Sequence, residues 1–263
     1  MSLVFAAITP HPPLLIENIG KDKLEKIEKT KSAMDAMEQE LYLAKPNVIM
    51  VISPHGSIFE DAFSVNADTK LTSSYEEFGD LATKDEWRGI PDMAAIISHK
   101  SNPKDIPVQL VSESRIDHGT SIPLHYLTRH LPEVKVLPVG FSGLDPKKHL
   151  DFGELLKDVI MESDKRVALI ASADLSHALT DESPAGFHID GKIFDEQAIT
   201  LLETRNTLGF AEMDPELVKN SACCGYRAIL LTLGVLKNMN YSFKNMAYEA
   251  PFGVGYLTGH FEF

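Results

Sequence analysis

The stretch NVIMVIS, residues 47–53, decides the fold, because every position between its two polar ends is apolar. A strand with one face in water alternates apolar and polar side chains, whereas a strand buried on both faces is continuously apolar. Comparable runs recur at LVFAAIT (3–9), IPVQLV (106–111), VKVLPVGF (134–141), RVALIASA (166–173) and VGYLTGHFEF (254–263). These runs predict the strands of a central sheet that is covered on both faces.

Segments with the pattern of helices lie between these runs. They span residues 21–44, 85–100, 121–131, 145–163, 188–205 and 221–238. This alternation favours a single-domain α/β sandwich, in which helices cover both faces of a mostly parallel or mixed central sheet. No repeat, low-complexity tract or shift in composition marks a linker, so we expect one catalytic domain over residues 1–263.

Composition argues against several classes of function. A formal net charge of −13 disfavours a nucleic-acid partner, because such proteins usually present a basic face. The N-terminus lacks the pattern of a signal peptide and no apolar run is long enough to span a bilayer, so we expect a cytoplasmic protein without membrane contact. No Walker or dinucleotide-binding glycine pattern occurs, which argues against a kinase, a GTPase or a Rossmann dehydrogenase. Homo-oligomerisation is compatible with this length, although no residue pattern specifies it.

Two histidines follow predicted strands in the same local form. His11 follows LVFAAITP and His55 follows NVIMVISP, so each stands after a Thr-Pro or Ser-Pro pair. Ligands of open α/β sheets bind at the carboxyl ends of the strands. Each histidine alone could be a turn residue that hydrogen-bonds a nearby carbonyl. Together they indicate a pair of metal ligands, because neutral imidazole suits Fe, Zn, Cu or Ni.

A third histidine, His177, follows the strand-like run at 166–173, with Asp174 three residues before it. A carboxylate near an imidazole can select its tautomer and raise its basicity. We therefore expect His177 to act as a general acid/base with Asp174 in support. The alternative is that Asp174 caps the turn that follows the strand.

His118 precedes a helix start that we expect at residue 120 or 121, where an anion would meet free backbone N–H groups. In the alternative interpretation, Asp117 and His118 only bracket this helix. His125 and His130 are expected at surface or groove positions on the amphipathic segment 121–131. No role is assigned to the four histidines in polar or terminal settings, which are His99, His149, His188 and His260.

Five motifs occur in a fixed order: TPHPP, SPHG, DHGTSIPLHYL, SADLSH and CCGYRAILLTLG. From about residue 5 to residue 260 the chain resembles the class III extradiol ring-cleavage dioxygenases, the LigB-like superfamily, and also its Memo-like branch. The resemblance implies one α/β domain in which two histidines and a carboxylate hold a non-haem ferrous ion. The two histidine ligands fall on His11 and His55. Two further active-site histidines, an acid/base and a group that contacts substrate or oxygen, fall on His177 and His118.

The family's carboxylate ligand has no counterpart at its usual place. That place, just before AILLTLGVL, holds SACCGYR, which contains no Asp or Glu. The Memo-like branch carries Cys-Gly there, so the resemblance places Cys224 as the third ligand. A thiolate shifts the preference toward Zn or Cu(I), although iron stays compatible. Glu249 is an alternative ligand if its loop folds over the site, and a solvated residue before a proline turn otherwise. We expect Cys223 to be a packing residue.

The resemblance implies an Fe(II)-dependent dioxygenase whose partners are a small catechol-type aromatic and O2. His177 would remove a catechol proton and later return it, while His118 would hydrogen-bond the oxygen or a ring oxygen. The missing carboxylate motivates an alternative, a Memo-like metal-binding protein with Zn or Cu and a redox or interaction role instead of ring cleavage. A zinc hydrolase that uses the same histidines ranks last, because no nucleophile or leaving-group pocket is evident.

Overall fold

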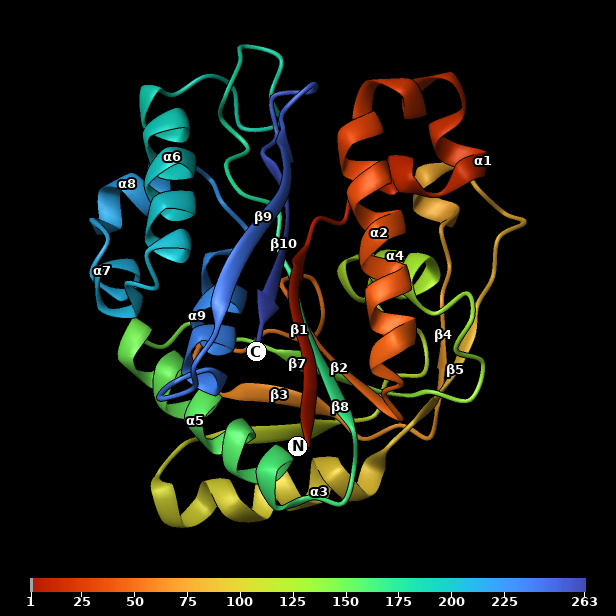
Figure 1. Cartoon of the computed structure of the whole chain (residues 1–263), viewed down its shortest axis with the longest axis vertical. Helices are drawn as coiled ribbons and strands as arrows, with labels where there is room; N and C mark the ends of the chain where they lie inside the picture. The colour runs from red at the N-terminus through yellow and green to blue at the C-terminus, as the bar shows by residue number, and fades with distance from the viewer. Residues whose placement is uncertain (1) are drawn as a thin grey trace.

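A mixed sheet of ten strands forms the centre of the molecule. The computed structural model describes residues 2–263 and is shown in Figure 1. Across the sheet the strands follow in the order β4 (Lys70–Thr72), β5 (Glu86–Gly89), β7 (Lys135–Gly140), β2 (Val48–Ser53), β8 (Val167–Ser172), β1 (Leu3–Thr9), β10 (Tyr256–Glu262) and β9 (Ser242–Glu249). Beside this path, β3 (Phe63–Asn66) pairs with β7 and with β6 (Val108–Val111).

The middle of the sheet is parallel. Strand β8 pairs in parallel with both β1 and β2, and β2 pairs in parallel with β7. Strand β10 lies antiparallel to β1, and β9 lies antiparallel to β10. The carboxyl ends of β2, β8 and β1 therefore lie side by side at one edge of the sheet, where an α/β protein places its ligand site.

Helices cover both faces of the sheet (Figure 1). On one face lie α2 (Glu28–Ala44) and α4 (His118–Leu127), and on the other lie α3 (Pro91–Ser101), α5 (Pro146–Glu162), α6 (Ile189–Glu203) and α9 (Tyr226–Val235). Short helices are α1 (Glu17–Gly20), α7 (Thr207–Ala211) and α8 (Pro215–Asn220), with 3₁₀ turns at Pro13–Leu15, Lys21–Ile27, Glu76–Phe78 and Asn102–Lys104. The predicted α/β sandwich is confirmed.

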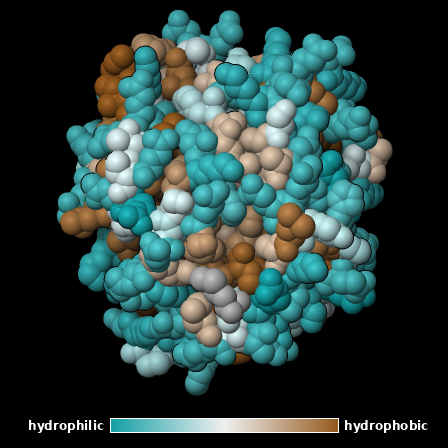
Figure 2. Space-filling model, viewed as in Figure 1, coloured by the Kyte–Doolittle hydropathy of each residue, from teal (hydrophilic) through white to brown (hydrophobic). Residues whose placement is uncertain are grey.

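Strand β2 shows why the apolar runs are continuous. Val48, Met50 and Ile52 face the core under α3, α5 and α9, whereas Ile49 and Val51 face the core under α2 and α4. Successive side chains of a strand point to opposite faces, so a strand with a helix layer on each face needs apolar residues at every position. The helix surfaces that face outward are mainly hydrophilic in the view of Figure 2.

Two segments begin their helices later than the sequence predicts. The segment at 85–100 starts as strand β5, and α3 begins only at Pro91, where the fixed φ of proline suits the first helical turn. The segment at 221–238 begins with a turn, and α9 starts at Tyr226. This turn packs so tightly that a Cβ on Gly225 would lie 2.4 Å from the Ala173 Cβ. A glycine at residue 225 is therefore required by close packing against the end of β8.

The sequence analysis did not predict the short strands at the margins of the sheet. Strands β3, β4 and β5 have three or four residues each, and β9 is mostly polar, so none shows a long apolar run. Within residues 2–263, no helix is both long and apolar enough to cross a bilayer.

Candidate metal centre

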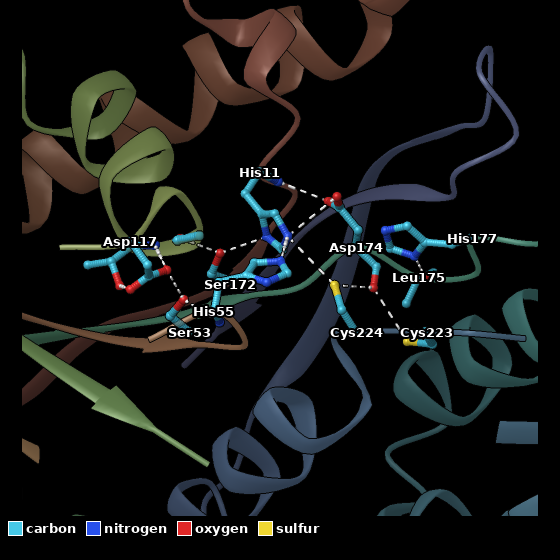
Figure 3. Close-up of polar contacts among 12 residues, drawn as sticks. His11, Ser53, His55, Asp117, Ser172, Asp174, Leu175, His177, Cys223 and Cys224 are labelled. Atoms are coloured by element: carbon cyan, nitrogen blue, oxygen red, sulfur yellow. Dashed lines mark hydrogen bonds and ion pairs between the residues drawn. The ribbon is translucent and has the colours of Figure 1, made fainter. Parts of the chain in front are cut away.

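Three histidines converge at the carboxyl edge of the parallel strands. His11 stands two residues after β1, His55 two residues after β2, and His118 is the first residue of α4. The rings of His11 and His55 lie side by side in Figure 3, and their Nε2 atoms are 3.1 Å apart. One ring nitrogen from each of the three histidines lies within 4.8 Å of the others. The structure thus brings together two histidines separated by 44 residues and a third from a helix.

The spacing of these nitrogens fits a shared cation. Two ligands at about 2.1 Å from one ion lie roughly 3.0 Å apart in octahedral geometry and roughly 3.4 Å apart in tetrahedral geometry. The separation of 3.1 Å between the Nε2 atoms of His11 and His55 falls in this range. The donor set is imidazole, which suits transition metals and not Mg²⁺ or Ca²⁺. These residues therefore fit a transition-metal ion.

Hydrogen bonds fix the tautomer of His11. The Ser172 hydroxyl donates to the backbone carbonyl of Gly119 at 2.5 Å, so its single proton is already used. Ser172 Oγ must then accept the proton of His11 Nδ1, at 2.9 Å. The lone pair of His11 is consequently on Nε2, the atom that faces His55. Ser172, at the end of β8, therefore orients the His11 ring, as a hydrogen-bonding partner of a metal-ligating histidine would.

A second set of hydrogen bonds joins the end of β2 to the start of α4. Ser53 Oγ accepts the backbone N–H of His55 at 3.2 Å and donates to Asp117 Oδ1 at 2.5 Å. Asp117 caps α4 by accepting the backbone N–H and the hydroxyl of Thr120, at 2.9 and 2.7 Å. The rings of His55 and His118 stack as a result, with centroids 4.2 Å apart. Asp117 does cap the helix, and α4 begins two or three residues earlier than expected.

Burial keeps the two central imidazoles neutral. Desolvation, and then the charges that His118 and His177 would carry, lower the pKa of His11 well below its usual value. Desolvation and the neighbouring His11 and His118 lower the pKa of His55 to about 3. A histidine must be neutral to bind a metal, so both rings are ready as ligands at neutral pH.

The Asp174 carboxylate contacts His11. Its Oδ1 accepts the backbone N–H of His11 at 2.9 Å, and its Oδ2 lies 3.5 Å from His11 Nε2. Burial raises the pKa of Asp174 to about 6, because the low-dielectric surroundings disfavour its ionised form. A carboxylate therefore does stand beside the histidines, although it comes from the end of β8 instead of the late helix of the family pattern.

His177 has one free ring nitrogen. Its Nδ1–H donates to the Leu175 carbonyl at 3.1 Å, since a carbonyl can only accept. The tautomer of His177 is thus set by Leu175, and not by Asp174 as the sequence led us to expect. The lone pair on Nε2 remains available for a proton. His177 lies close enough to His11 to influence its pKa electrostatically.

Cys224 reaches the site from the turn before α9. Its Sγ lies 3.6 Å from His11 Nε2 and 3.6 Å from the backbone oxygen of Asp174 (Figure 3). Burial raises the pKa of the Cys224 thiol well above its usual value, so it is protonated at neutral pH unless a cation is bound. Cys223 donates to the same oxygen at 3.4 Å and packs against the core, which agrees with a packing role.

Glu249 is engaged elsewhere. Its Oε1 accepts the backbone N–H of Thr30 at 2.7 Å, close to the start of α2. This bond satisfies a free N–H group in the first turns of the helix and ties α2 to β9. Glu249 therefore has a structural partner of its own, and it is not a member of the cluster of His11, His55 and His118.

The histidines outside the cluster have ordinary partners. His125 lies 2.9 Å from Asp85, and His130 lies 2.8 Å from Glu38. His149 was expected in a polar setting, but it is fully buried, and its Nδ1–H donates to the Asp145 carbonyl at 2.8 Å. Desolvation lowers the pKa of His149 to about 4.

A cavity of about 700 Å³ reaches Cys224, although His11, His55 and His118 are not among its lining residues. It begins at Pro54 and Cys224, and its wall includes Phe141, Met213 and Tyr226. Sequence analysis did not find these wall residues, because apolar side chains of a pocket look like those of any core. The hydroxyl of Tyr226 donates to the Phe210 carbonyl at 3.1 Å.

Comparison with known proteins identifies the family. The family model described as the catalytic LigB subunit of aromatic ring-opening dioxygenase matches residues 5–259. The chain belongs to this family. LigB proteins are metal-dependent, and the three histidines of this LigB domain could hold the metal.

Individual relatives agree with the family match. Protein CA_C1420 of Clostridium acetobutylicum is 26% identical over 97% of this chain, and a MEMO1 family protein of Methanosarcina mazei is 25% identical over 76% of it. The chain spans 57% and 66% of the lengths of these two relatives. An uncharacterized protein of Escherichia coli K12, JW3007, shares the fold with a TM-score of 0.68 at 17% identity, over 98% of this chain and 99% of that one. The MEMO1 relatives support the Memo-like features of the sequence.

Proposed function

We propose that this LigB-family protein is a ferrous-iron-dependent extradiol ring-cleavage dioxygenase that acts on a catechol-type aromatic. One observation carries the proposal: three imidazoles have ring nitrogens within 4.8 Å of one another, and Cys224, whose Sγ lies 3.6 Å from His11 Nε2, lines a cavity with an apolar, partly aromatic wall. Membership of the family of ring-opening dioxygenases supports this chemistry.

His11 and His55 would hold the metal through Nε2, with an anionic group beside them. Two groups that a bound cation would make anionic are in reach, because Asp174 Oδ2 and Cys224 Sγ lie 3.5 and 3.6 Å from His11 Nε2. When bound, ferrous iron would supply the electron transfer between an aromatic ring and dioxygen. Both oxygen atoms would enter the product, so no external reductant is required.

His177 would move the proton. Because its Nδ1–H is committed to the Leu175 carbonyl, Nε2 is the atom that can take a proton from a substrate hydroxyl and later return it. His118 would orient the substrate or the oxygen. Its ring is stacked on His55 and makes a T-shaped contact with the Phe78 ring, with centroids 5.2 Å apart, so its position is well defined.

Oxygen uptake tests the proposal. Iron-loaded protein is expected to consume O2 with at least one member of a broad catechol panel and to form a yellow ring-opened product, followed with an oxygen electrode and by absorbance. His177→Gln should lower kcat by about 10²- to 10⁴-fold, the usual contribution of a general acid/base, with unchanged metal content. Absence of uptake across the panel by fully iron-loaded protein would contradict the proposal.

A second candidate function is a Memo-like metal-binding protein without ring cleavage, in a redox or interaction role. The position of Cys224 favours it, because a thiolate ligand would select Zn or Cu(I). If Cys224 is a ligand, Cys224→Ala should lose most of its metal by elemental analysis, whereas Cys223→Ala should keep it. A Cys224→Ala protein with full metal content would show that the carboxylate of Asp174 suffices, and would favour the iron enzyme.

A further inference from the structure

Asp195 is a buried carboxylate that the proposed chemistry does not use. It lies on α6 and is only 1% exposed. Its Oδ1 accepts the backbone N–H of Ser176 at 2.8 Å, and its Oδ2 accepts the hydroxyl of Tyr248 at 2.6 Å. Burial raises the pKa of Asp195 to about 6, so the carboxylate is ionised at neutral pH. Its two hydrogen bonds join α6 to β9 and to the segment just before His177.

One peptide group lies between Asp195 and His177. The carbonyl of Leu175 and the N–H of Ser176 belong to the same peptide group, which is planar. Its N–H donates to Asp195 Oδ1, and its carbonyl accepts the Nδ1–H of His177 at 3.1 Å, the contact drawn in Figure 3. The N–H and the carbonyl of a trans peptide point in opposite directions, so the carboxylate and the imidazole hold this group from its two sides. A rotation of the peptide plane would break both hydrogen bonds.

Gly255 fixes the backbone on either side of this peptide group. The N–H of Leu175 donates to the Gly255 carbonyl at 2.8 Å, and the N–H of Gly255 donates to the Ser176 carbonyl at 2.8 Å. Gly255 also makes room for the carboxylate, because a Cβ at this position would lie 2.2 Å from Asp195 Oδ2. The peptide group between Leu175 and Ser176 is therefore held in one orientation, with its N–H toward Asp195.

We propose that Asp195 is a positioning residue for His177 and acts through the peptide group between Leu175 and Ser176. The hydrogen bond that a neutral imidazole makes decides which of its nitrogens carries the proton. By holding the Leu175 carbonyl toward the ring, Asp195 keeps the proton of His177 on Nδ1 and the lone pair on Nε2. The charge of Asp195 also polarises the peptide group, which makes its carbonyl a better acceptor.

The consequence for catalysis rests on the proposed ring cleavage, in which Nε2 of His177 takes a proton from the substrate. In the opposite tautomer Nε2 already carries a proton and cannot accept another. The tautomer itself is a property of the metal-free protein, so it can be measured without iron and without substrate.

Nitrogen NMR of the imidazoles in ¹⁵N-labelled, metal-free protein tests the inference at pH 8, where an ordinary imidazole is neutral. The wild type is expected to carry the His177 proton on Nδ1. Asp195→Leu, which has a similar shape but no acceptor, should move this proton to Nε2 in most molecules. Asp195→Asn, whose amide oxygen can accept the same N–H, should keep it on Nδ1. His149 donates its Nδ1–H to the Asp145 carbonyl and serves as an internal control that stays unchanged in each variant.

Gly255→Ala perturbs the same contact without removing the carboxylate, because the new Cβ displaces the end of the Asp195 side chain. It serves as the second variant if Asp195→Leu fails to fold. In each folded protein, hydrogen exchange of the Ser176 amide reports whether its bond to Asp195 is present. Slow exchange should accompany a proton on His177 Nδ1, and fast exchange a proton on Nε2. A wild type with the proton on Nε2, or a folded variant in which exchange and tautomer disagree, would overturn the inference.

Turnover of the iron-loaded protein with a catechol measures the consequence. Asp195→Leu should lower kcat at least about tenfold, and by less than His177→Gln, while KM and metal content stay unchanged because the imidazole is still present. Asp195→Asn should restore most of kcat. Undiminished kcat in an Asp195→Leu protein with the shifted tautomer would overturn the role of Asp195 in catalysis. The expected tautomers without ring cleavage by the wild type would contradict only the proposed function.

Discussion

Replacing His11 by alanine is expected to reduce the metal content of the protein from roughly one ion per chain to background. His11 supplies the nitrogen that lies 3.1 Å from His55 Nε2, 3.5 Å from Asp174 Oδ2 and 3.6 Å from Cys224 Sγ. Every other group in ligand reach is thus arranged around this one atom. Mutation of a group that only hydrogen-bonds a metal ligand usually lowers metal affinity by at most about 100-fold. Because His11 would be a ligand itself, His11→Ala should lower metal affinity by more than this. Elemental analysis and competition with a chelator measure it.

Two further variants serve as comparisons for His11→Ala: Ser172→Ala, with a smaller expected loss of metal affinity, and His130→Ala, with none. Ser172→Ala keeps the imidazole of His11 but removes the acceptor of its Nδ1–H, so metal affinity should fall by about 10- to 100-fold. His130 contacts Glu38 on the surface, and its replacement should leave metal affinity unchanged. If His11→Ala retained full metal content with native circular dichroism, the metal centre would lie somewhere else in the protein.

The positions of His11 and His55 could be predicted because of a general property of parallel sheets. The sequence shows only that each follows an apolar run and a proline, and parallel strands end at the same edge of a sheet. The strand order β2–β8–β1, which makes the two rings neighbours, appears only in the structure. Prediction of the pair therefore needed no knowledge of strand order.

Contacts across long stretches of chain could not be predicted. The bond between Ser53 and Asp117 joins residues 64 positions apart, and neither residue type signals a partner at that distance. The contact of Asp174 with His11 is of the same kind. Sequence proximity suggested His177, three residues on, whose charge does act on Asp174, but the hydrogen bond to the backbone of His11, 163 residues away, appears only in the folded chain.

Asp174→Asn is expected to stabilise the metal-free protein at pH 7.5 while it weakens metal binding. Burial raises the folded-state pKa of Asp174 to about 6, against an ordinary value of 3.8. Between pH 3.8 and pH 6 the folded protein binds more protons than the unfolded chain, so the free energy of unfolding falls as pH rises. Above about pH 6 the full cost of burying the ionised carboxylate is present. Two pKa units correspond to about 3 kcal/mol. Asparagine removes the charge and can still accept the His11 N–H.

Urea denaturation in the presence of a chelator measures this gain, which should approach 3 kcal/mol at pH 7.5 and vanish near pH 4, where the native carboxyl is itself neutral. Asp195 provides a matched control, since burial also raises its pKa to about 6 while its carboxylate bonds Ser176 and Tyr248. Asp195→Asn should leave metal affinity intact, whereas Asp174→Asn should lower it at least about tenfold. If metal-free Asp174→Asn were less stable than the wild type at pH 7.5, the buried carboxylate of Asp174 would not be destabilising, and the prediction would be wrong. A cation beside His11 would favour the ionised form of Asp174 and offset this cost in the metal-bound protein, whereas Asp195 has the same raised pKa and bonds only Ser176 and Tyr248 among the contacts described, so the comparison of the two variants separates the effect of burial from the effect of the metal.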